Sequence, residues 1–449
     1  MKVAIIGSGV SGLSAASRLL ERNNCSTIDV YEAASKSGGR ISSFNWQLKN
    51  NEEFPCDTGQ HFSIGAYKNF IELLERCDAL KYWTRHSFEW NLLKLRENEI
   101  QKLLHFKISE IKFFKKVLLP YIKFIKVPTK FFFLKFYFSI FLLRTKLFNA
   151  NALCELYDKF YFSDVSLDLF WNAFAENSMN TEYENADLNT LSFLVNECMK
   201  DIPGCIDILL PKSDYYSCAI SPIENNLRSN GVNFFFNSLI ENIQPSRRLK
   251  YRGMLSQSYD KIVLAVPGYT ASKIWMRSGF STTKESLQWE NQKYRHILNL
   301  WVIAHPIANE SKDNKHKSTC FSWNPIEFNG SFYVVVIQKS RERPNLLSII
   351  KSACNNDNLV NEEKNLMNFA SLFLQARYAI RLEDCEYKLI RAKRATIACT
   401  ADQGKNSALW SGIETGISGI FKCSDEASLN FPSTIEGAVK SGYLAAESI

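Results

Sequence analysis

The first thirty residues follow the hydrophobic pattern of a strand, a helix and a second strand. Residues 2–6 form an apolar run of strand length, and residues 27–31 form another. Between them, residues 12–21 place Leu13, Ala16 and Leu19 at helical spacing on one side. Two short apolar runs around an amphipathic helix predict a β-α-β unit with parallel strands. We therefore expect the chain to open with a parallel α/β sheet.

Later hydrophobic runs predict both helices and strands. Helical spacing covers residues 68–78, 151–200 and 359–380. Strand-like runs cover residues 231–236, 239–243 and 259–267, and more follow between 295 and 340, including 333–337. Short apolar runs rich in β-branched and aromatic residues are typical of strands. We expect 231–236 and 239–243 to be a strand and its return strand, and both to rejoin the first sheet with 259–267. The chain contains no internal repeat and no low-complexity linker.

Three glycines follow the first strand, at Gly7, Gly9 and Gly12. In this context the first permits a sharp exit from the strand, the second lets a pyrophosphate approach the backbone, and the third allows the helix to pack closely. Glu32 follows the second strand, 20 residues after Gly12, where a carboxylate can bind the ribose hydroxyls of an adenosine. A purely structural turn is the alternative, but the strand-loop-helix context favours a dinucleotide site at the helix N-terminus.

The composition is that of a globular protein, with 449 residues of which 46% are hydrophobic and 22% charged. Twelve cysteines occur without a CxxC pair or zinc-like spacing, and no secretory signal precedes the first strand. This pattern predicts free thiols in a reducing cytosol. We find no motif for a metal site, for a serine-histidine-aspartate arrangement or for a nucleotide-hydrolase phosphate loop. Neither a metal nor nucleic acid is an expected partner.

The net charge of +8 is concentrated in one stretch. Residues 107–146 hold nine lysines and Arg144 against Glu110 alone, which gives a local charge of +9. No apolar run there approaches the roughly 20 residues that a membrane-spanning helix needs. Apolar residues alternate with lysine, which is typical of helices lying in a membrane interface with lysine stems reaching toward anionic headgroups. We expect residues 107–148 to be helical and to face a membrane. The alternative is that they are core helices whose residue content reflects a genome biased toward A and T.

A second glycine pair decides between FAD and NAD. Gly38, Gly39 and Arg40 come soon after Glu32, and residues 32–40 resemble the second signature of the flavin amine oxidase and phytoene desaturase superfamily. The resemblance implies that FAD is the cofactor. It also implies that the two glycines pass close to it and that Arg40 adds positive charge near its diphosphate.

The distant end of the sequence supplies the other half of this resemblance. Asp425 matches the aspartate that the superfamily places at the flavin ribityl and diphosphate region. The residue before it is Ser424, where the family usually has glycine, and residues 426–430 lack the family's common glycine. Such a change alters how closely the backbone can approach the cofactor, so FAD affinity is the property that it puts in question.

A helix is expected to begin just beyond this aspartate. Pro432 precedes Thr434 and Ile435, and proline is favoured next to a helix start. Backbone N–H groups at such an N-terminus can stabilise negative charge on a reduced flavin. We interpret Glu436 as a capping or salt-bridge residue and not as an acid catalyst.

Within the superfamily, a narrower match begins at Asp57. Residues 57–67, DTGQHFSIGAY, resemble the DxGQH…GAY segment of hydroxysqualene dehydroxylase, a squalene-associated flavoprotein family of bacterial hopanoid pathways. Further matches follow in the family's order at residues 171–172, 178–181, 207–214 and 393–396, and the resemblance thins over 85–150 and 280–390. It implies reductive removal of a hydroxyl group from a C30 isoprenoid alcohol to give squalene, with FAD supplying the electrons.

The same motif contains the candidate catalytic residues. His61 is the first candidate for a proton donor, because imidazole titrates near neutral pH and the motif is expected to lie by the flavin. A structural histidine is the alternative. Asp57 is interpreted as an orienter of His61 or as a turn residue. Tyr67, Trp171 and Asn180 are candidates to line a substrate tunnel, with ordinary core packing as the alternative for the aromatic residues.

These expectations combine into one α/β architecture. A Rossmann-like FAD-binding domain of the glutathione-reductase and amine-oxidase type is interleaved with an α+β substrate domain and a helical, membrane-facing region. The FAD-binding domain is expected to comprise residues 1–80, 225–275 and 390–449. The substrate domain is expected to comprise residues 81–224 and 276–389.

The expected partners are a long-chain isoprenoid and an anionic membrane surface, at the inner face of the cytoplasmic membrane. Two other interpretations stay open. A carotenoid or phytoene-type desaturase would move hydride toward the flavin, in the opposite direction. A degenerate, non-catalytic lipid-binding protein would keep the fold without tight FAD contact, as Ser424 suggests. An amine oxidase is disfavoured, because neither its aromatic cage nor its flavin-linking cysteine context is recognisable near the C-terminus.

Overall fold

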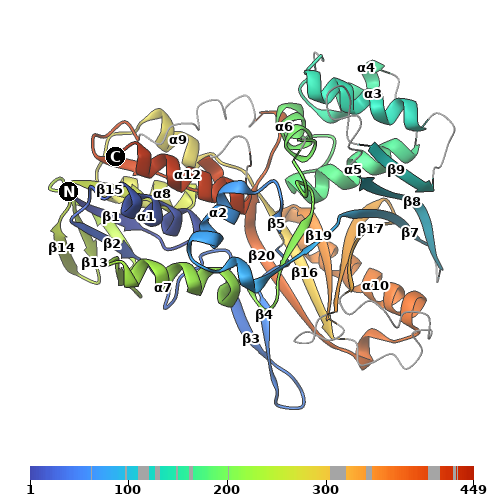
Figure 1. The fold of residues 1–449 in the computed structure, drawn as a ribbon, viewed down its shortest axis with the longest axis horizontal. Coiled ribbons are helices and arrows are strands. Elements are labelled where there is room, and N and C mark those ends of the chain that lie inside the picture. The colour runs from blue at the N-terminus through green and yellow to red at the C-terminus, as the bar shows by residue number, and fades with distance from the viewer. Residues whose placement is uncertain are drawn as a thin grey trace.

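The expected β-α-β unit opens the fold, as β1 (Lys2–Ile6), α1 (Val10–Arg22) and β2 (Thr27–Tyr31). The structure is a computed structural model, which describes residues 1–61, 63–96, 99–109, 121–126, 132–147, 150–160, 165–200, 202–303, 320–339, 346–402, 415–427, 431 and 433–449. Its ribbon has a parallel sheet with helices at one end and a larger, mostly antiparallel sheet at the other (Figure 1).

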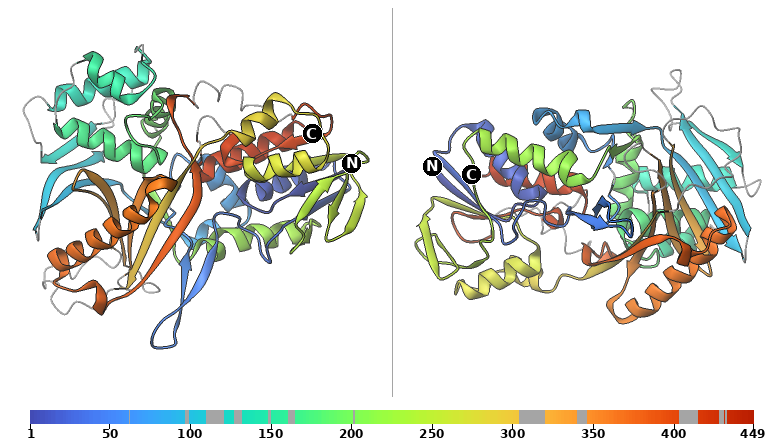
Figure 2. Two further views of the ribbon diagram at one scale, coloured as in Figure 1. Left: turned by 180° about the vertical axis from the view of Figure 1, so that it is seen from behind. Right: turned by 90° about the horizontal axis from the view of Figure 1, so that it is seen from below.

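Strands from three distant parts of the sequence build the parallel sheet. Its order is β11-β2-β1-β15-β21, and every neighbouring pair is parallel. The added strands are β11 (Asn233–Phe235), β15 (Lys261–Leu264) and β21 (Ile420–Lys422). The marked N and C ends lie near each other in every view (Figure 1, Figure 2). The expected meeting of the N- and C-terminal segments is thereby confirmed.

Both faces of this sheet are covered, which is why its strands are almost continuously apolar. One face packs on α1, α2 (Lys68–Arg76), α7 (Ser221–Ser229) and α12 (Ile435–Glu447). The other face packs on α8 (Gly268–Arg277), α9 (Lys284–Glu290) and a small antiparallel sheet of β12 (Ile240–Ile243), β13 (Arg248–Tyr251) and β14 (Met254–Ser258).

The expectation for residues 239–243 was wrong in one respect. They form β12, but this strand pairs with β13 and does not rejoin the first sheet. The physical reason lies in the neighbouring strand β11, which runs parallel to β2. The connection from Phe235 to Ile240 is too short for the crossover that a further parallel strand would need, and β12 pairs antiparallel with β13 instead. The chain therefore leaves the sheet and forms a meander of hairpins on its face.

An eight-stranded sheet forms the second body, in the order β20-β16-β19-β18-β17-β7-β8-β9. Its strands are β7 (Glu89–Arg96), β8 (Glu99–Ser109), β9 (Tyr121–Lys126), β16 (Tyr294–Ile303), β17 (Cys320–Phe328), β18 (Ser331–Lys339), β19 (Leu346–Cys354) and β20 (Glu386–Ile397). Neighbours are antiparallel except β17 and β7. Helix α10 (Leu359–Tyr378) covers one face. The other face is covered by α3 (Phe132–Thr145), α4 (Leu153–Phe160), α5 (Val165–Met179) and α6 (Leu188–Cys198).

Strand β18 shows how the hydrophobic pattern builds two cores at once. Tyr333 and Val335 pack in the core under α10, while Val334 and Val336 pack in the core under the other helices. Successive side chains of a strand point to opposite faces, so a strand covered on both sides must be apolar throughout.

The basic segment differs from the helical expectation. Helix α3 is present, but residues 121–126 form strand β9, which pairs with β8, and the expected helix over 111–119 lies outside the described residues. Tyr121, Ile122 and Phe124 are of the aromatic and β-branched types that favour strands. Lysines on an edge strand also oppose pairing with another chain. Among the described helices, none combines the length and apolar character needed to cross a membrane.

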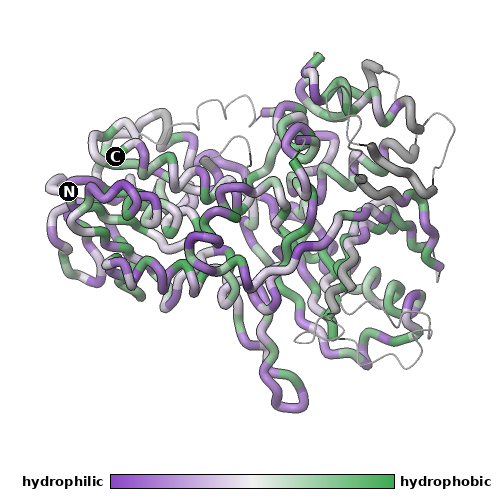
Figure 3. Tube along the Cα trace, viewed as in Figure 1, coloured by the Kyte–Doolittle hydropathy of each residue, from purple (hydrophilic) through white to green (hydrophobic). Residues whose placement is uncertain are grey.

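Two small sheets complete the described fold. The hairpin of β3 (Ser43–Gln47) and β4 (Glu53–Asp57) extends away from both bodies, and its tip is hydrophilic (Figure 3). A three-stranded sheet consists of β5 (Ser63–Ile64), β10 (Ile208–Pro211) and β6 (Trp83–His86). The DTGQH motif runs from Asp57, the last residue of β4, toward β5, and it contacts Arg40 on one side and Asn299 of β16 on the other.

Candidate cofactor and substrate site

Three glycines shape the loop between β1 and α1, and they do so differently. Gly7 has a φ of +105°, and a Cβ atom there would lie 2.4 Å from the Ala265 carbonyl oxygen. A Cβ atom on Gly12 would lie 2.0 Å from the Gly7 carbonyl oxygen. A Cβ atom on Gly9 would meet nothing nearer than the Gly39 Cα atom, at 3.9 Å. The first two glycines are required by packing, whereas the backbone at Gly9 faces open space.

The second glycine pair lies against the first loop. Gly9 and Gly38 form a parallel bridge, and the Gly38 N–H donates to the Ser8 carbonyl oxygen at 3.0 Å. Gly39 has a φ of +61°, which favours glycine, and a Cβ atom there would lie 3.2 Å from the Gly9 Cα atom. The structure therefore brings together Gly9, Gly38 and Gly39 as one bare stretch of backbone.

Glu32 lies directly after β2, beside the same loop. One carboxylate oxygen accepts hydrogen bonds from the Ser8 N–H at 2.8 Å and the Ser8 hydroxyl at 2.9 Å, and the other accepts from the Ala34 N–H at 2.9 Å. The carboxylate thus braces the glycine-rich loop, a role that the sequence did not indicate. Its position at the carboxyl end of β2 agrees with the expectation for a ribose-binding acid.

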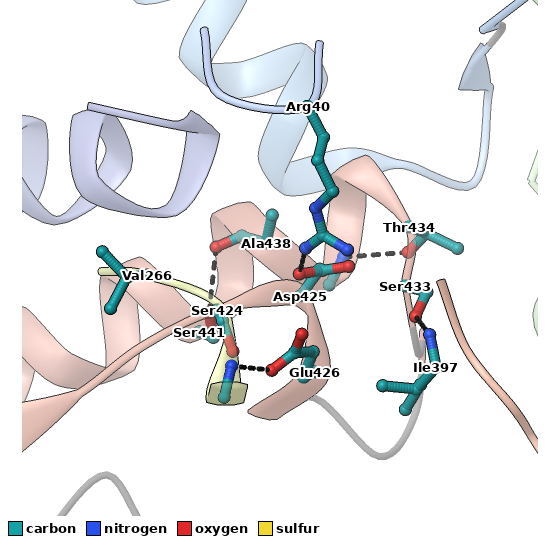
Figure 4. Close-up of polar contacts among 12 residues, drawn as sticks. Arg40, Val266, Ile397, Ser424, Asp425, Glu426, Ser433, Thr434, Ala438 and Ser441 are labelled. Carbon is teal, nitrogen blue, oxygen red and sulfur yellow. Dashed lines mark hydrogen bonds and ion pairs between the residues drawn. The ribbon is translucent and has the colours of Figure 1, made fainter. Parts of the chain in front are cut away.

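Arg40 and Asp425 form an ion pair across the junction of the N- and C-terminal segments (Figure 4). The guanidinium of Arg40 also donates to the Ala395 carbonyl oxygen at 3.1 Å. Burial by itself would lower the pKa of Arg40, but the carboxylates of Asp425 and Glu426 outweigh it and raise that pKa. The pair joins Arg40 of the second glycine signature to Asp425, the C-terminal residue of the resemblance, in one place.

Ser424, where the family has glycine, is part of a buried polar cluster. Its hydroxyl accepts from the Lys422 ammonium at 2.9 Å, and the same ammonium donates to the Val266 carbonyl oxygen at 3.0 Å. Glu426 accepts from the Gly268 N–H at 2.7 Å and from the Tyr294 hydroxyl at 3.0 Å. Burial lowers the pKa of Lys422 and raises that of Glu426. The turn residues 428–430 lie outside the described part of the chain.

Helix α12 begins as the sequence predicted. Thr434 is its N-cap, and the Thr434 hydroxyl accepts from the Gly437 N–H at 3.0 Å. The Ser433 N–H donates to the Asp425 carbonyl oxygen at 3.1 Å, which ties the helix start to the ion pair. Ile435 is the first helical residue and is buried. Pro432 lies outside the described residues.

The capping interpretation of Glu436 is confirmed, although the helix that it caps is α2. Its carboxylate accepts from the Asn69 N–H at 3.1 Å, the Asn69 amide at 2.6 Å and the Phe70 N–H at 3.0 Å. Tyr67, the N-cap residue of α2, makes no side-chain cap. A buried acid from α12 therefore satisfies the orphan donors of another helix.

The arrangement fits a bound dinucleotide. Helix α1 begins at Gly9, its N-cap residue, and has no side-chain cap on its first N–H groups. The hydroxyl of Ser37, just before the second glycine pair, is buried and has no hydrogen-bond partner among the described residues. Bare backbone, an uncapped helix N-terminus and an unpaired hydroxyl together suit a pyrophosphate. Gly7, Gly12 and Glu32 form the frame around that position.

His61 lies in the segment between the two bodies, with its ring 5.6 Å from the Tyr215 ring in an edge-on contact. Burial, with a smaller contribution from Arg40, lowers its pKa to about 4. An imidazole with this pKa is neutral at pH 7. The reason for naming His61 as proton donor, a pKa near neutrality, is thereby corrected.

Asp57 is buried and braces the backbone. Its carboxylate accepts from the Ser43 hydroxyl at 2.7 Å and from the Tyr215 N–H at 2.9 Å. Its carbonyl oxygen accepts from the Trp301 indole at 3.0 Å. These contacts join the β3–β4 hairpin to β16 and to the π-helical turn Tyr216–Ile220, which gives Asp57 a structural function.

The three candidates for a tunnel lining make different contacts, and Trp171 and Tyr67 both pack in the hydrophobic core under α3 to α6. Trp171 is 2% exposed and donates to the Ser139 hydroxyl at 3.1 Å inside the helical core. Asn180 joins β19 to β20, because it accepts from the Ala353 N–H at 2.5 Å and donates to the Thr396 hydroxyl at 2.7 Å. Tyr67 packs edge-on against Phe431, at 5.7 Å between ring centroids, close to the start of α12. Tyr67 thus contacts the residues before α12, and Asn180 contacts β20 next to Ala395, the carbonyl acceptor of Arg40.

Sequence reasoning passed over two amides that the structure brings together. The Gln60 N–H donates to the Asn299 side-chain oxygen at 3.2 Å. Gln60 belongs to the DTGQH motif, and Asn299 is the polar residue in the apolar run 297–303 of β16. A buried amide in an otherwise hydrophobic strand is the signal that could have identified the second residue.

Comparisons with known proteins agree with this geometry. A family described as an NAD(P)-binding Rossmann-like domain matches residues 5–77. Zeta-carotene desaturase of Solanum lycopersicum is 37% identical over 81 residues, which are 18% of this chain and 13% of that protein. The 15-cis-phytoene desaturase of Synechococcus elongatus is 34% identical over 94 residues, 20% of this chain and 18% of that protein. Each match thus spans less than a fifth of the curated relative.

The structural likeness extends over the whole chain. Cyclohexylamine oxidase from Brevibacterium oxydans superposes with a TM-score of 0.68 at 15% identity, covering 100% of this chain and 98% of that one. At this level of identity the likeness establishes the fold. The chain accordingly has a mixed α/β fold of the amine-oxidase type, with a Rossmann-like segment at residues 5–77.

Proposed function

We propose that this protein is an FAD-dependent oxidoreductase that removes a hydroxyl group reductively from a C30 isoprenoid alcohol, giving squalene from hydroxysqualene. The observation that carries the proposal is the cradle at Gly9, Gly38 and Gly39, closed by the ion pair of Arg40 with Asp425. Its N-terminal part resembles that of carotene and phytoene desaturases, whose names describe them as redox enzymes of isoprenoids. The DTGQH motif resembles a segment of hydroxysqualene dehydroxylase, and this resemblance is the reason for proposing the alcohol as the substrate.

The residues around the cradle divide the work of holding the cofactor. Gly9 and the α1 N-terminus would hold the pyrophosphate, and Glu32 would bind the ribose. Arg40 would bind the diphosphate, and Asp425 would bind the ribityl and diphosphate region. The α12 N-terminus would stabilise negative charge on the flavin ring. FAD would supply the hydride that replaces the hydroxyl group.

The polypeptide's own contribution is to orient the alcohol and to exclude water. The DTGQH segment lies between the two bodies, where side chains of the eight-stranded sheet meet the elements around Arg40. The neutral His61 is suited to accept or relay a proton at pH 7, and a separate acid must protonate the leaving hydroxyl.

The exposed aromatic residues of α3 would contact the membrane in which a C30 isoprenoid substrate is dissolved. Phe138 and Phe141 are 40% and 47% exposed and stack on each other, and Arg144 and Lys146 follow them. Apolar rings beside basic residues suit an anionic membrane surface. We infer that α3 rests on the inner face of the cytoplasmic membrane, so that the isoprenoid need not pass through water.

A desaturase acting on phytoene or a carotene is the second candidate, and the similarity to two such enzymes favours it. The decisive experiment incubates the purified protein anaerobically with reduced FAD and hydroxysqualene and looks for squalene by mass spectrometry. A parallel incubation with oxidised FAD and phytoene tests the second candidate. Turnover of phytoene alone would refute the dehydroxylase proposal. Absence of bound flavin, seen by absorbance, would instead favour the non-catalytic lipid-binding protein.

A further inference from the structure

Two buried amide atoms beside the cradle have no hydrogen-bond partner in the described part of the chain. They are the side-chain oxygen of Gln60, Oε1, and the side-chain nitrogen of Asn299, Nδ2. Asn299 is 1% exposed. A buried polar atom left unpaired costs about 1–3 kcal/mol, so a native structure has a reason to keep such an atom. Here an unused acceptor and an unused donor belong to two residues that touch.

The surrounding bonds fix which atom of each amide is unused. The Asn299 oxygen accepts from the Gln60 N–H at 3.2 Å and from the Ser348 hydroxyl at 2.8 Å, so its nitrogen is the remaining atom. The Gln60 nitrogen donates to the His61 carbonyl oxygen at 3.1 Å, so its oxygen is the remaining atom. Turning the Asn299 amide over would set its nitrogen against the Gln60 N–H, and turning the Gln60 amide over would set its oxygen against the His61 carbonyl oxygen, so these two bonds fix both orientations.

The two amides lie where the cofactor elements meet the eight-stranded sheet. The Thr58 hydroxyl donates to the Arg40 carbonyl oxygen at 3.3 Å, so the DTGQH segment adjoins the Arg40–Asp425 pair. On β16, Trp301 holds the same segment through the Asp57 carbonyl oxygen at 3.0 Å. The unused donor and acceptor therefore belong to the junction at which a substrate would reach the cofactor.

We propose that Gln60 and Asn299 form the binding site for the hydroxyl group of the substrate alcohol. A hydroxyl oxygen accepts from the Asn299 amide while the hydroxyl hydrogen is donated to the Gln60 oxygen, so one group satisfies both atoms. A hydrocarbon satisfies neither, and an ammonium group can only donate. The inference deepens and rests on the proposed dehydroxylation, because it gives the site a preference for an alcohol over a carotene or an amine.

The test compares the binding of hydroxysqualene and squalene, dispersed in the same detergent, to the oxidised protein by quenching of tryptophan fluorescence. Two hydrogen bonds to buried partners predict that wild type binds the alcohol about tenfold more tightly. In Gln60→Met, which keeps the chain length but removes the acceptor, this preference should vanish. Asn299→Asp keeps the contacts to the Gln60 N–H and Ser348 but loses the donor, and should also lose it. Gln47→Met, the same change at an exposed position of β3, is the matched control and should retain it.

Each outcome decides the matter. Equal affinities in wild type, or an unchanged preference in both amide variants, overturn the proposal and leave a bound water as the partner of the two atoms. Loss of bound FAD in the amide variants, with the alcohol preference intact, assigns the pair to the flavin instead. Binding is measured without turnover, so a preference for alcohol without squalene formation would refute the proposed reaction and not the hydroxyl site. Thermal unfolding of each variant verifies that it is folded.

Discussion

Replacing Gly9 by alanine separates the fold from cofactor binding. The backbone of Gly9 has a φ of −69° and a ψ of 175°, which alanine adopts without strain. An added Cβ atom would find nothing within 3.9 Å in the protein itself. It would occupy the space that we assign to the pyrophosphate.

Gly9→Ala should not lower the free energy of unfolding of the flavin-free protein, but it should lower the affinity for FAD. Without cofactor, Gly9→Ala should leave the free energy of unfolding unchanged or raise it by up to about 1 kcal/mol, because alanine restricts the unfolded chain. FAD affinity should fall at least about tenfold, or about 1.4 kcal/mol, since the pyrophosphate can no longer approach the backbone. Gly12→Ala is the contrasting variant. Its Cβ atom would lie 2.0 Å from the Gly7 carbonyl oxygen, so it should destabilise the apoprotein by about 1–3 kcal/mol.

Two measurements on each variant suffice. Chemical denaturation of the flavin-free protein gives the free energy of unfolding, and titration with FAD, followed by quenching of flavin fluorescence, gives the dissociation constant. A Gly9→Ala protein that binds FAD as tightly as wild type would show that nothing approaches this loop. In that case the assignment of the dinucleotide site would be wrong.

Three further predictions concern groups around the site. The pKa of His61 is lowered to about 4 in the folded protein. As the pH falls from about 6.5 to 4, the unfolded chain therefore takes up a proton at His61 before the folded protein does, and the free energy of unfolding should fall. This fall amounts to at most about 3.4 kcal/mol, of which about 2 kcal/mol falls between pH 7 and pH 5, so His61→Gln should lose about 2 kcal/mol less than wild type in denaturation at these two pH values; equal losses would contradict the lowered pKa. Glu436→Ala should lower the free energy of unfolding by about 1–3 kcal/mol by leaving donors of α2 unpaired, and an unaltered denaturation midpoint would refute its capping role. Wild type should sediment with anionic vesicles at low salt, Phe138→Ser combined with Phe141→Ser should not, and Leu444→Ser, at an exposed position on α12, should behave as wild type; equal sedimentation of all three would remove α3 as the membrane surface.

Local patterns predicted the elements well where one rule determined the outcome. The β-α-β unit could be predicted because its strands are apolar throughout and Gly7, Gly9 and Gly12 follow in the right context. Helix α12 was located from its proline and Thr434. Strand β12 was misplaced because a short apolar run does not reveal its partner, and only the tight connection after β11 decides it.

The site was predicted in outline but not in its contacts. Arg40 and Asp425 could be brought together through a resemblance, since their meeting depends on segments hundreds of residues apart. Capping by Glu436 was predicted, but the helix that it caps and the contacts of Asp57 were not, because a sequence does not show which distant backbone groups a carboxylate reaches. The lowered pKa of His61 arises from burial, which no local pattern gives.

The pairing of β15 with β21 has a consequence for biosynthesis. Ile262 of β15 lies beside Ile420, so the edge of β15 stays uncovered until the much later strand has emerged from the ribosome. At about 5–20 residues per second this wait lasts on the order of ten seconds. During that time an apolar parallel strand offers an unprotected edge to other nascent chains. Yield in a heterologous host should therefore depend on chaperone supply and growth temperature more than on the stability of the finished protein.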